Sequence, residues 1–157
     1  MRLSKKGMYA LRVLPHLAEA FRNGRRALSV AELARRESVP PKYLEQILLT
    51  LRKQGILVSE RGKEGGYALR NAPEQITLGD IIRAVDGRLA PIPCASRTAP
   101  ADSDPDCPYP FETCWIRHLM IRVRDNISSV LDRENLAEMT LQSEESRKGR
   151  KGNRGGH

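Results

Sequence analysis

Three cysteines, Cys94, Cys107 and Cys114, are the side chains of this sequence that most directly indicate chemistry. They fall within 21 residues of one another. An odd number of thiols argues against a framework of disulfides. In a reducing compartment, cysteines at such spacing act as ligands of zinc or of an iron–sulfur cluster, or as a redox switch. The sequence therefore predicts metal, iron–sulfur or redox chemistry here and leaves these alternatives open.

A metal centre on three thiols needs a further ligand, because iron–sulfur clusters usually take four. His118 follows Cys114 by four residues, so both would project from one face of a helix start. Asp102, Asp104 and Asp106 would be alternative oxygen ligands. His118 as a partly buried helix residue without a metal is the competing interpretation. A cluster with an incomplete set of thiolates is labile, which suits a sensor.

The elements around the cysteines are a loop and two helices. Residues 88–110 are rich in Pro, Ala, Ser and Asp and lack an apolar period, which predicts a loop. A loop of this length is usually functional or disordered. Before it, a capping pattern at Thr77–Asp80 begins a short helix that ends at Asp86-Gly87. After it, a long helix is predicted from about Phe111 to about Glu134.

The predicted long helix carries a heptad seam. Its apolar residues recur at intervals of four, three, four and three: Ile116, Met120, Val123, Ile127 and Val130. No other predicted helix is long enough to cover this seam, so we expect it to pair with its copy in a homodimer. Packing against its own domain is the alternative.

Residues 1–70 predict a winged helix-turn-helix. An apolar stripe over residues 8–21 indicates the first helix, and a capping box at Ser29–Glu32 begins the second. Pro41 begins a third helix that runs to about Gln54. Residues 56–69 predict two short strands around a charged, glycine-rich turn, which is a wing. The predicted fold class is therefore mainly α with a small β-hairpin wing, followed by a long C-terminal dimerisation helix.

The distribution of charge indicates the partner. The chain has 157 residues and a net charge of +8, but the first 70 residues hold 15 Lys and Arg against 6 Asp and Glu. A basic domain favours polyanions through phosphate contacts and counterion release. No nucleophile–base pair or glycine-rich nucleotide loop is recognisable, so we expect no enzyme activity. No apolar run approaches the ~20 residues that span a bilayer, and the N-terminus lacks a signal-peptide pattern. We therefore expect a cytoplasmic protein without membrane contact.

The residues that face DNA follow from helix geometry. Lys42, Tyr43, Glu45 and Gln46 point outward from the predicted third helix, and Gln46 suits adenine as Glu45 suits cytosine. Contacts to the backbone or a flanking groove are expected from the helix starts and the wing. The full predicted set is Arg2, Lys5, Ser29, Lys42, Tyr43, Glu45, Gln46, Arg61 and Lys63.

Four stretches of this sequence resemble the IscR/NsrR/RirA/CymR family of bacterial regulators over roughly residues 1–135. They are the opening Met1–Leu11, the third helix Tyr43–Gly55, the wing Arg61–Leu69 and the short helix Asp80–Gly87. The resemblance implies a homodimeric winged-helix regulator, in many members with an iron–sulfur cluster on three cysteines. Cys94, Cys107 and Cys114 stand in those places.

The sequence departs from the family pattern at three points. Twelve residues separate Cys94 from Cys107, which is a longer interval than in the best-known members. Position 8 is Met, where nitric-oxide-sensing relatives place a carboxylate ligand. The last cysteine is followed by His118 at a slightly longer interval than the family's histidine ligand.

The sequence thus predicts a regulator that binds a pseudo-palindromic double-stranded operator as a dimer, and we expect it to act as a repressor. A 2Fe-2S or 4Fe-4S cluster would control its DNA affinity in response to iron, redox state or reactive oxygen or nitrogen species. The alternatives are a metal-free thiol switch or structural zinc on the same fold, or a redox protein that uses the winged helix for protein contacts. The predicted regions are 1–70 for DNA binding, 71–110 for the short helix and sensor loop, 111–139 for dimerisation and 140–157 for a disordered basic tail.

Overall fold

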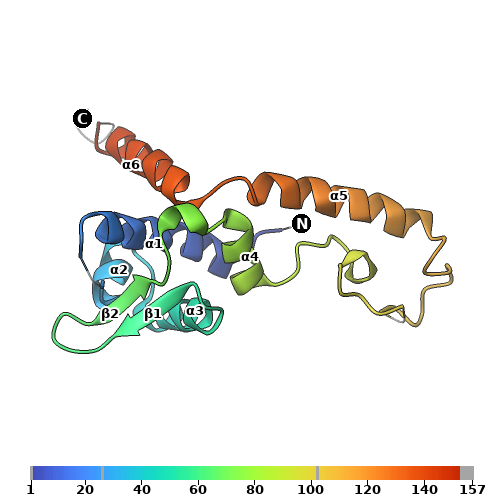
Figure 1. Cartoon of the computed structure of the whole chain (residues 1–157), viewed down its shortest axis with the longest axis horizontal. Helices are drawn as coiled ribbons and strands as arrows, with labels where there is room; N and C mark the ends of the chain where they lie inside the picture. The colour runs from blue at the N-terminus through green and yellow to red at the C-terminus, as the bar shows by residue number, and fades with distance from the viewer. Residues whose placement is uncertain (1, 26, 102, 153–157) are drawn as a thin grey trace.

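Helices pack beside a two-stranded hairpin at the edge of the molecule in the computed structural model, which describes residues 2–25, 27–101 and 103–152 (Figure 1). The order of elements is α1 (Lys5–Arg22), α2 (Val30–Glu37), α3 (Pro41–Lys53), β1 (Leu57–Glu60), β2 (Gly66–Leu69), η1 (Pro73–Gln75), α4 (Leu78–Asp86), η2 (Pro93–Ala95), α5 (Trp115–Leu131) and α6 (Leu136–Gly152). This arrangement confirms the predicted fold class, mainly α with a hairpin wing.

Local signals in the sequence place the helix starts. Ser29 caps α2 by accepting a hydrogen bond from the Glu32 amide, and Pro41 occupies the first turn of α3. Thr77 and Asp80 form a reciprocal capping box at the start of α4. Each of these starts was predicted from the sequence to within a residue or two, because each depends on neighbours in the chain.

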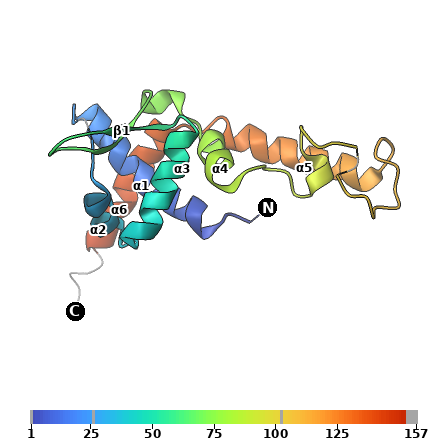
Figure 2. The ribbon, with the colours of Figure 1, turned by 90° about the horizontal axis from the view of Figure 1, so that it is seen from below.

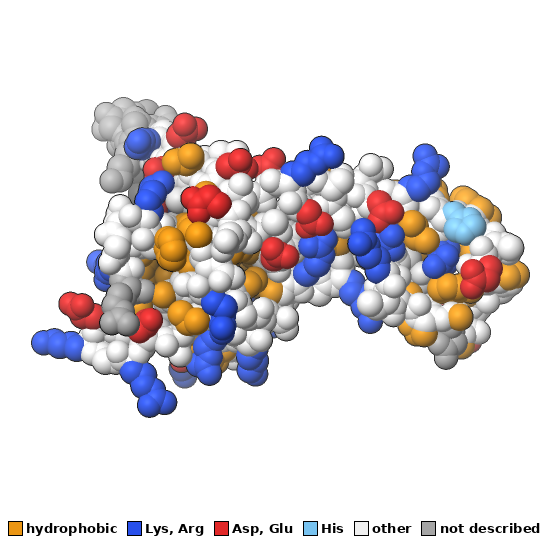
Figure 3. All heavy atoms as spheres, viewed as in Figure 1, with side chains coloured by type: hydrophobic (Ala, Val, Ile, Leu, Met, Phe, Trp, Pro, Cys, Tyr) orange, Lys and Arg blue, Asp and Glu red, His pale blue; other side chains and the backbone are white. Residues whose placement is uncertain are grey.

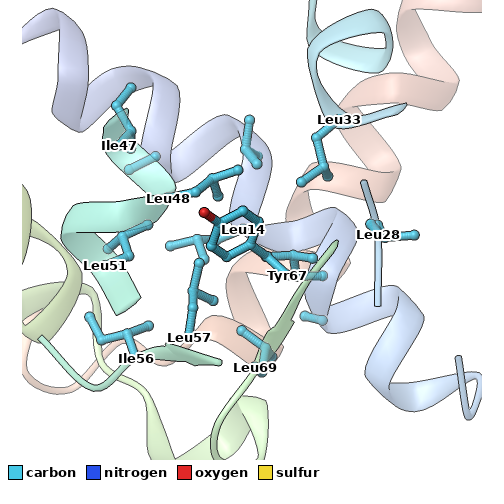
Figure 4. Close-up of a cluster of buried hydrophobic side chains, with 14 of the residues drawn as sticks. Leu14, Leu28, Leu33, Ile47, Leu48, Leu51, Ile56, Leu57, Tyr67 and Leu69 are labelled. Carbon is cyan, nitrogen blue, oxygen red and sulfur yellow. The ribbon is translucent and has the colours of Figure 1, made fainter. Parts of the chain in front are cut away.

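Aliphatic side chains from α1, α2, α3 and both strands form the core of the DNA-binding region (Figure 4). Leu14, Leu33, Leu44, Leu48 and Leu57 are completely buried there. Burial of one such side chain stabilises the fold by about 1.5–3 kcal/mol. The same core includes Ile76, Ile81 and Leu136, so the folded unit is larger than the predicted region 1–70.

The wing is an antiparallel pair in which Leu57 faces Leu69 and Glu60 faces Gly66. It is attached to the body by a bridge between Leu28 and Tyr67, with N···O distances of 3.0 and 2.8 Å. Figure 2 shows the hairpin at one end of the molecule, with α3 between it and α4. The wing and α3 therefore belong to one rigid unit.

The segment with the cysteines runs outward from this unit after α4, and helix α5 runs back above it towards the body (Figure 1). Helix α5 begins at Trp115 and ends at Leu131, inside the predicted span of 111–139. A turn then leads into α6, which lies along α1 (Figure 1).

The prediction of a disordered basic tail over residues 140–157 is wrong for residues 140–152, which belong to α6. Thr140 is buried against the body, Arg22 pairs with Glu144, and Arg147 binds Glu19 and His16 of α1. These partners are more than 100 residues away in the chain, so the polar composition did not reveal them. Residues 153–157 of the predicted tail lie outside the described residues.

Candidate nucleic-acid interface and cysteine site

The solvent-facing side of α3 carries the side chains that sequence analysis assigned to base contacts. Lys42, Glu45 and Gln46 are exposed, whereas the opposite face of α3 is buried in the core. No ion pair involving Lys42 or Glu45 is made with another described residue. Their polar ends are therefore free to meet a groove of DNA.

Tyr43 differs from the prediction, because it is half-buried and does not point freely outward. Its ring packs edge-on against Tyr9, with centroids 5.7 Å apart. Lys5 and Arg12 lie over the same Tyr9 ring at 5.7 and 5.4 Å from its centroid. Tyr43 thus attaches α3 to α1, and Lys5 is placed beside the recognition helix by a cation–π contact.

Ser29 uses its hydroxyl within the chain, as the cap of α2. At the same helix start, Arg25 donates to both Glu32 carboxylate oxygens, at 3.0 and 2.7 Å. These hydrogen bonds hold the pKa of Glu32 below its usual value. Because the Ser29 oxygen accepts in this cap, its O–H remains available to donate to a phosphate.

Basic side chains gather over the wing and along the lower side of the domain (Figure 3). Arg61 and Lys63 project from the wing turn, and Arg2 precedes α1; all three are exposed. Two further arginines, Arg35 of α2 and Arg52 of α3, are exposed as well and were not among the predicted DNA-facing residues. The available signal was their position on the polar face of each predicted helix.

Cys94 lies in η2 and Cys114 is the N-cap of α5, and both contact Arg117 in the first turn of α5. Cys114 is buried and caps α5, with its Sγ accepting from the Arg117 amide at 3.5 Å. The Arg117 side chain donates from Nε to the Cys94 carbonyl at 3.0 Å and packs on the Phe111 ring at 3.9 Å. The positive guanidinium is thus held between the segments that carry two of the three thiols.

Cys107 is exposed on the loop, in a turn closed by a hydrogen bond from its amide to the Asp104 carbonyl at 3.1 Å. His118, Asp104 and Asp106 are exposed too, and Asp102 lies outside the described residues. Within the described part of the chain, no three His, Cys, Asp or Glu side chains are close enough to hold a metal ion. The donor chemistry fits an iron–sulfur cluster, but the three thiols would have to come closer together to hold one.

The seam of α5 lies on a different face from the one that contacts the loop. Arg117, Arg124 and Ser128 face the loop, and Arg124 donates to the Ala95 carbonyl at 2.6 Å. Because successive residues are ~100° apart around a helix, the seam residues lie roughly a third of a turn away from the loop-facing side chains. Four of them, Ile116, Met120, Val123 and Ile127, are only half-buried, and Val130 is 60% exposed.

A winged helix-turn-helix with an exposed polar third helix and a basic wing is typical of a DNA-binding transcriptional regulator. Among the described residues, no helix is long and apolar enough to cross a membrane. Residues 3–142 match the Rrf2 family, described as iron-dependent transcriptional regulators, and the chain belongs to that family. The relatives are regulators and not enzymes, which confirms the resemblance and the expectation of no enzyme activity.

Three relatives cover most of the chain. It is 39% identical over 138 residues to a putative Rrf2-like regulator of Rhodobacter capsulatus, covering 87% of this chain and 91% of that protein. The solved structure of CymR, the global cysteine regulator of B. subtilis, matches with a TM-score of 0.69 and 32% identity, covering 90% of this chain and 98% of CymR. IscR of T. potens matches with a TM-score of 0.69 and 29% identity, covering 93% and 90%.

Proposed function

We propose that this regulator is a cytoplasmic, homodimeric repressor whose affinity for a pseudo-palindromic operator depends on an iron–sulfur cluster held by Cys94, Cys107 and Cys114. The observation that carries the proposal is the attachment of Cys94 and Cys114 to one residue, Arg117, at the first turn of α5. Similarity to IscR supports the cluster. His118 is the proposed fourth ligand, one residue beyond Arg117.

The proposed switch links the loop to α5. When bound, the cluster supplies oxidisable and exchangeable iron–thiolate bonds, which respond to iron and to reactive oxygen or nitrogen species. Arg117 would orient both segments, through its amide to the Cys114 sulfur and through its side chain to the Cys94 carbonyl. Binding of Cys107 to the cluster would order the loop against α5, and loss of the cluster would release the loop. Such a two-state element would change the spacing of the two recognition helices in a dimer.

Replacement of any one cysteine by alanine is expected to abolish the visible absorbance of the cluster. The reason is that two thiols and one weak ligand hold the cluster too poorly to survive purification. Anaerobically purified protein would be assayed for absorbance, iron and sulfide, and its operator affinity measured by anisotropy. The three variants should shift DNA affinity in the same direction, whereas Ser103→Ala, in the same loop, should match the wild type. Stoichiometric zinc without sulfide would refute the cluster.

Gln46 and Glu45 are the proposed base-reading residues of α3. We expect Gln46→Ala to weaken operator binding by about tenfold or more and to relax specificity at one position of each half-site, since a bidentate contact contributes about 1–3 kcal/mol. Lys42→Ala should weaken binding to all sequences and reduce the salt dependence. Gln54→Ala, an exposed glutamine at the other end of α3, is the control. Equal losses for Gln46→Ala and Gln54→Ala would contradict this assignment.

A thiol switch without metal is the second candidate. It is favoured by the exposure of the Cys107 thiol, by the absence of an assembled group of three metal ligands among the described residues, and by the similarity to CymR, a global cysteine regulator. It predicts metal-free protein whose DNA affinity changes with thiol oxidation and is restored by a reductant. The iron and sulfide assays distinguish the two candidates.

A further inference from the structure

A hollow of about 400 Å³ lies between α4, the segment after it and α5. This volume is within the range of small-molecule sites, roughly 300–1,000 Å³. None of the described residues that line it belongs to α3 or the wing. Its walls carry four arginines: Arg83, Arg88, Arg97 and Arg124. The hollow is therefore strongly basic and separate from the proposed DNA-reading surface.

Two of these arginines have carboxylate partners. Arg83 donates to both oxygens of Asp132, at 2.7 and 2.9 Å, and this interaction lowers the pKa of Asp132. The pair is therefore ionised on both sides at neutral pH and balances its own charge. Arg124 donates to Asp125 at 2.7 Å and to the Ala95 carbonyl at 2.6 Å. Both side chains are held in fixed positions.

The other two arginines keep a surplus of positive charge in the hollow. Arg88 is exposed and forms no ion pair with a described residue. Arg97 lies 3.9 Å from Asp125, a carboxylate that Arg124 already binds, and it helps Arg83 to lower the pKa of Asp132. Neither Arg88 nor Arg97 has a carboxylate of its own, and guanidinium forks match the geometry of phosphate and carboxylate groups.

Ser128 supplies a separate indication of a ligand. It is the only buried residue of α5, a helix that the structure describes throughout, and it is 7% exposed and lines the hollow. Its hydroxyl donates no hydrogen bond to a described residue, whereas the hydroxyl of neighbouring Ser129 donates to the Asn126 carbonyl at 2.9 Å. Among the described residues no buried side-chain nitrogen or oxygen lacks a hydrogen-bond partner, so the Ser128 hydroxyl opens to the solvent of the hollow and is available to a ligand there.

We propose that this hollow binds a small anionic metabolite carrying phosphate or carboxylate groups, held by Arg88, Arg97 and Ser128. The ligand would connect α4, which packs in the core of the DNA-binding region, to α5 and to the loop. It would add to the Arg83–Asp132 pair, which joins α4 to the end of α5. The site is a second regulatory input that does not depend on the chemistry of the cysteines.

Calorimetric titration of the full-length protein tests the proposal, with inorganic phosphate, pyrophosphate and citrate as probes and neutral glycerol as the blank. We expect saturable binding of at least one anion with one site per chain. Arg88→Ala, Arg97→Ala and Ser128→Ala should each weaken it, the arginine variants by about tenfold or more because a charge-assisted hydrogen bond is lost. Arg122→Ala, an exposed arginine on another face of α5, should bind like the wild type. Preference for pyrophosphate or citrate identifies the phosphate or the carboxylate class.

Two results would overturn the proposal. One is the absence of saturable binding for all three anions at millimolar concentration. The other is a uniform loss of DNA affinity with a smaller salt dependence in Arg88→Ala and Arg97→Ala, without any site for free anions, because the hollow would then contact the DNA backbone. A triple cysteine-to-alanine variant should retain anion binding, which separates this site from the proposed cluster.

Discussion

Val123→Asp is expected to convert the protein from a dimer to monomers and to lower operator affinity at least a hundredfold. Val123 lies in the middle of the α5 seam, on the face that its own chain leaves half-exposed. In a dimer this face would be buried against its copy, and an unpaired carboxylate there costs several kcal/mol in each subunit. A monomer presents only one recognition helix and cannot contact the second half-site, so its DNA affinity is lower.

Sedimentation velocity at micromolar concentration measures the change, with circular dichroism as the check that the helices persist. Ser129→Asp adds the same charge on the polar face of α5, where the side chain is exposed, and should remain dimeric. Ile127→Asp, one helical turn along the seam, should behave like Val123→Asp. Two dimeric seam variants would mean that α5 does not form the interface.

Gly66→Ala is expected to destabilise the protein by about 3–5 kcal/mol and to abolish specific DNA binding, from the usual range for strained and overpacked positions. Gly66 has φ +147°, where an L side chain is strained. An added Cβ would lie 2.1 Å from the Leu28 carbonyl oxygen and 2.5 Å from its carbon. The strand would have to move from Leu28, which breaks the bridge that attaches the wing.

Gly62→Ala is the matched control for this change. Gly62, also in the wing, has φ +111°, but an added Cβ would meet nothing within 4 Å. Gly62→Ala should lower the stability only by the cost of the strained backbone, about 1–2 kcal/mol. Chemical denaturation measures both variants. Similar losses would show that the backbone conformation alone, and not the contact with Leu28, limits position 66.

Local patterns were sufficient for the DNA-binding region. The starts of α2, α3 and α4 depend on residues three or four positions apart, such as Thr77 with Asp80, and the wing depends on a glycine-rich turn between two short apolar runs. The apolar face of α3 follows from helical periodicity. For the same reason the exposure of Lys42, Glu45 and Gln46 was predictable, because a residue opposite a buried face is exposed.

Long-range contacts decided the rest. Residues 140–152 have the composition of a disordered tail, yet Arg147 reaches Glu19 and the buried His16, which in turn contacts Glu37 of α2 at 2.8 Å. Tyr43 was expected to face DNA, but its side chain is half-buried and its ring packs against the ring of Tyr9.

At the cysteines, chain spacing indicates metal, iron–sulfur or redox chemistry and leaves these alternatives open, whereas the distances among the thiols depend on the path of the loop. In the folded chain Arg117 contacts both the Cys94 carbonyl and the Cys114 sulfur, and Cys107 is exposed. The basic hollow has the same origin, because Arg83, Arg97 and Ser128 come from separate elements and meet only after folding. Periodicity and capping are properties of neighbouring residues, so they can be recognised directly in the sequence. A site assembled from distant segments depends on how the elements pack, and only the tertiary structure contains that information.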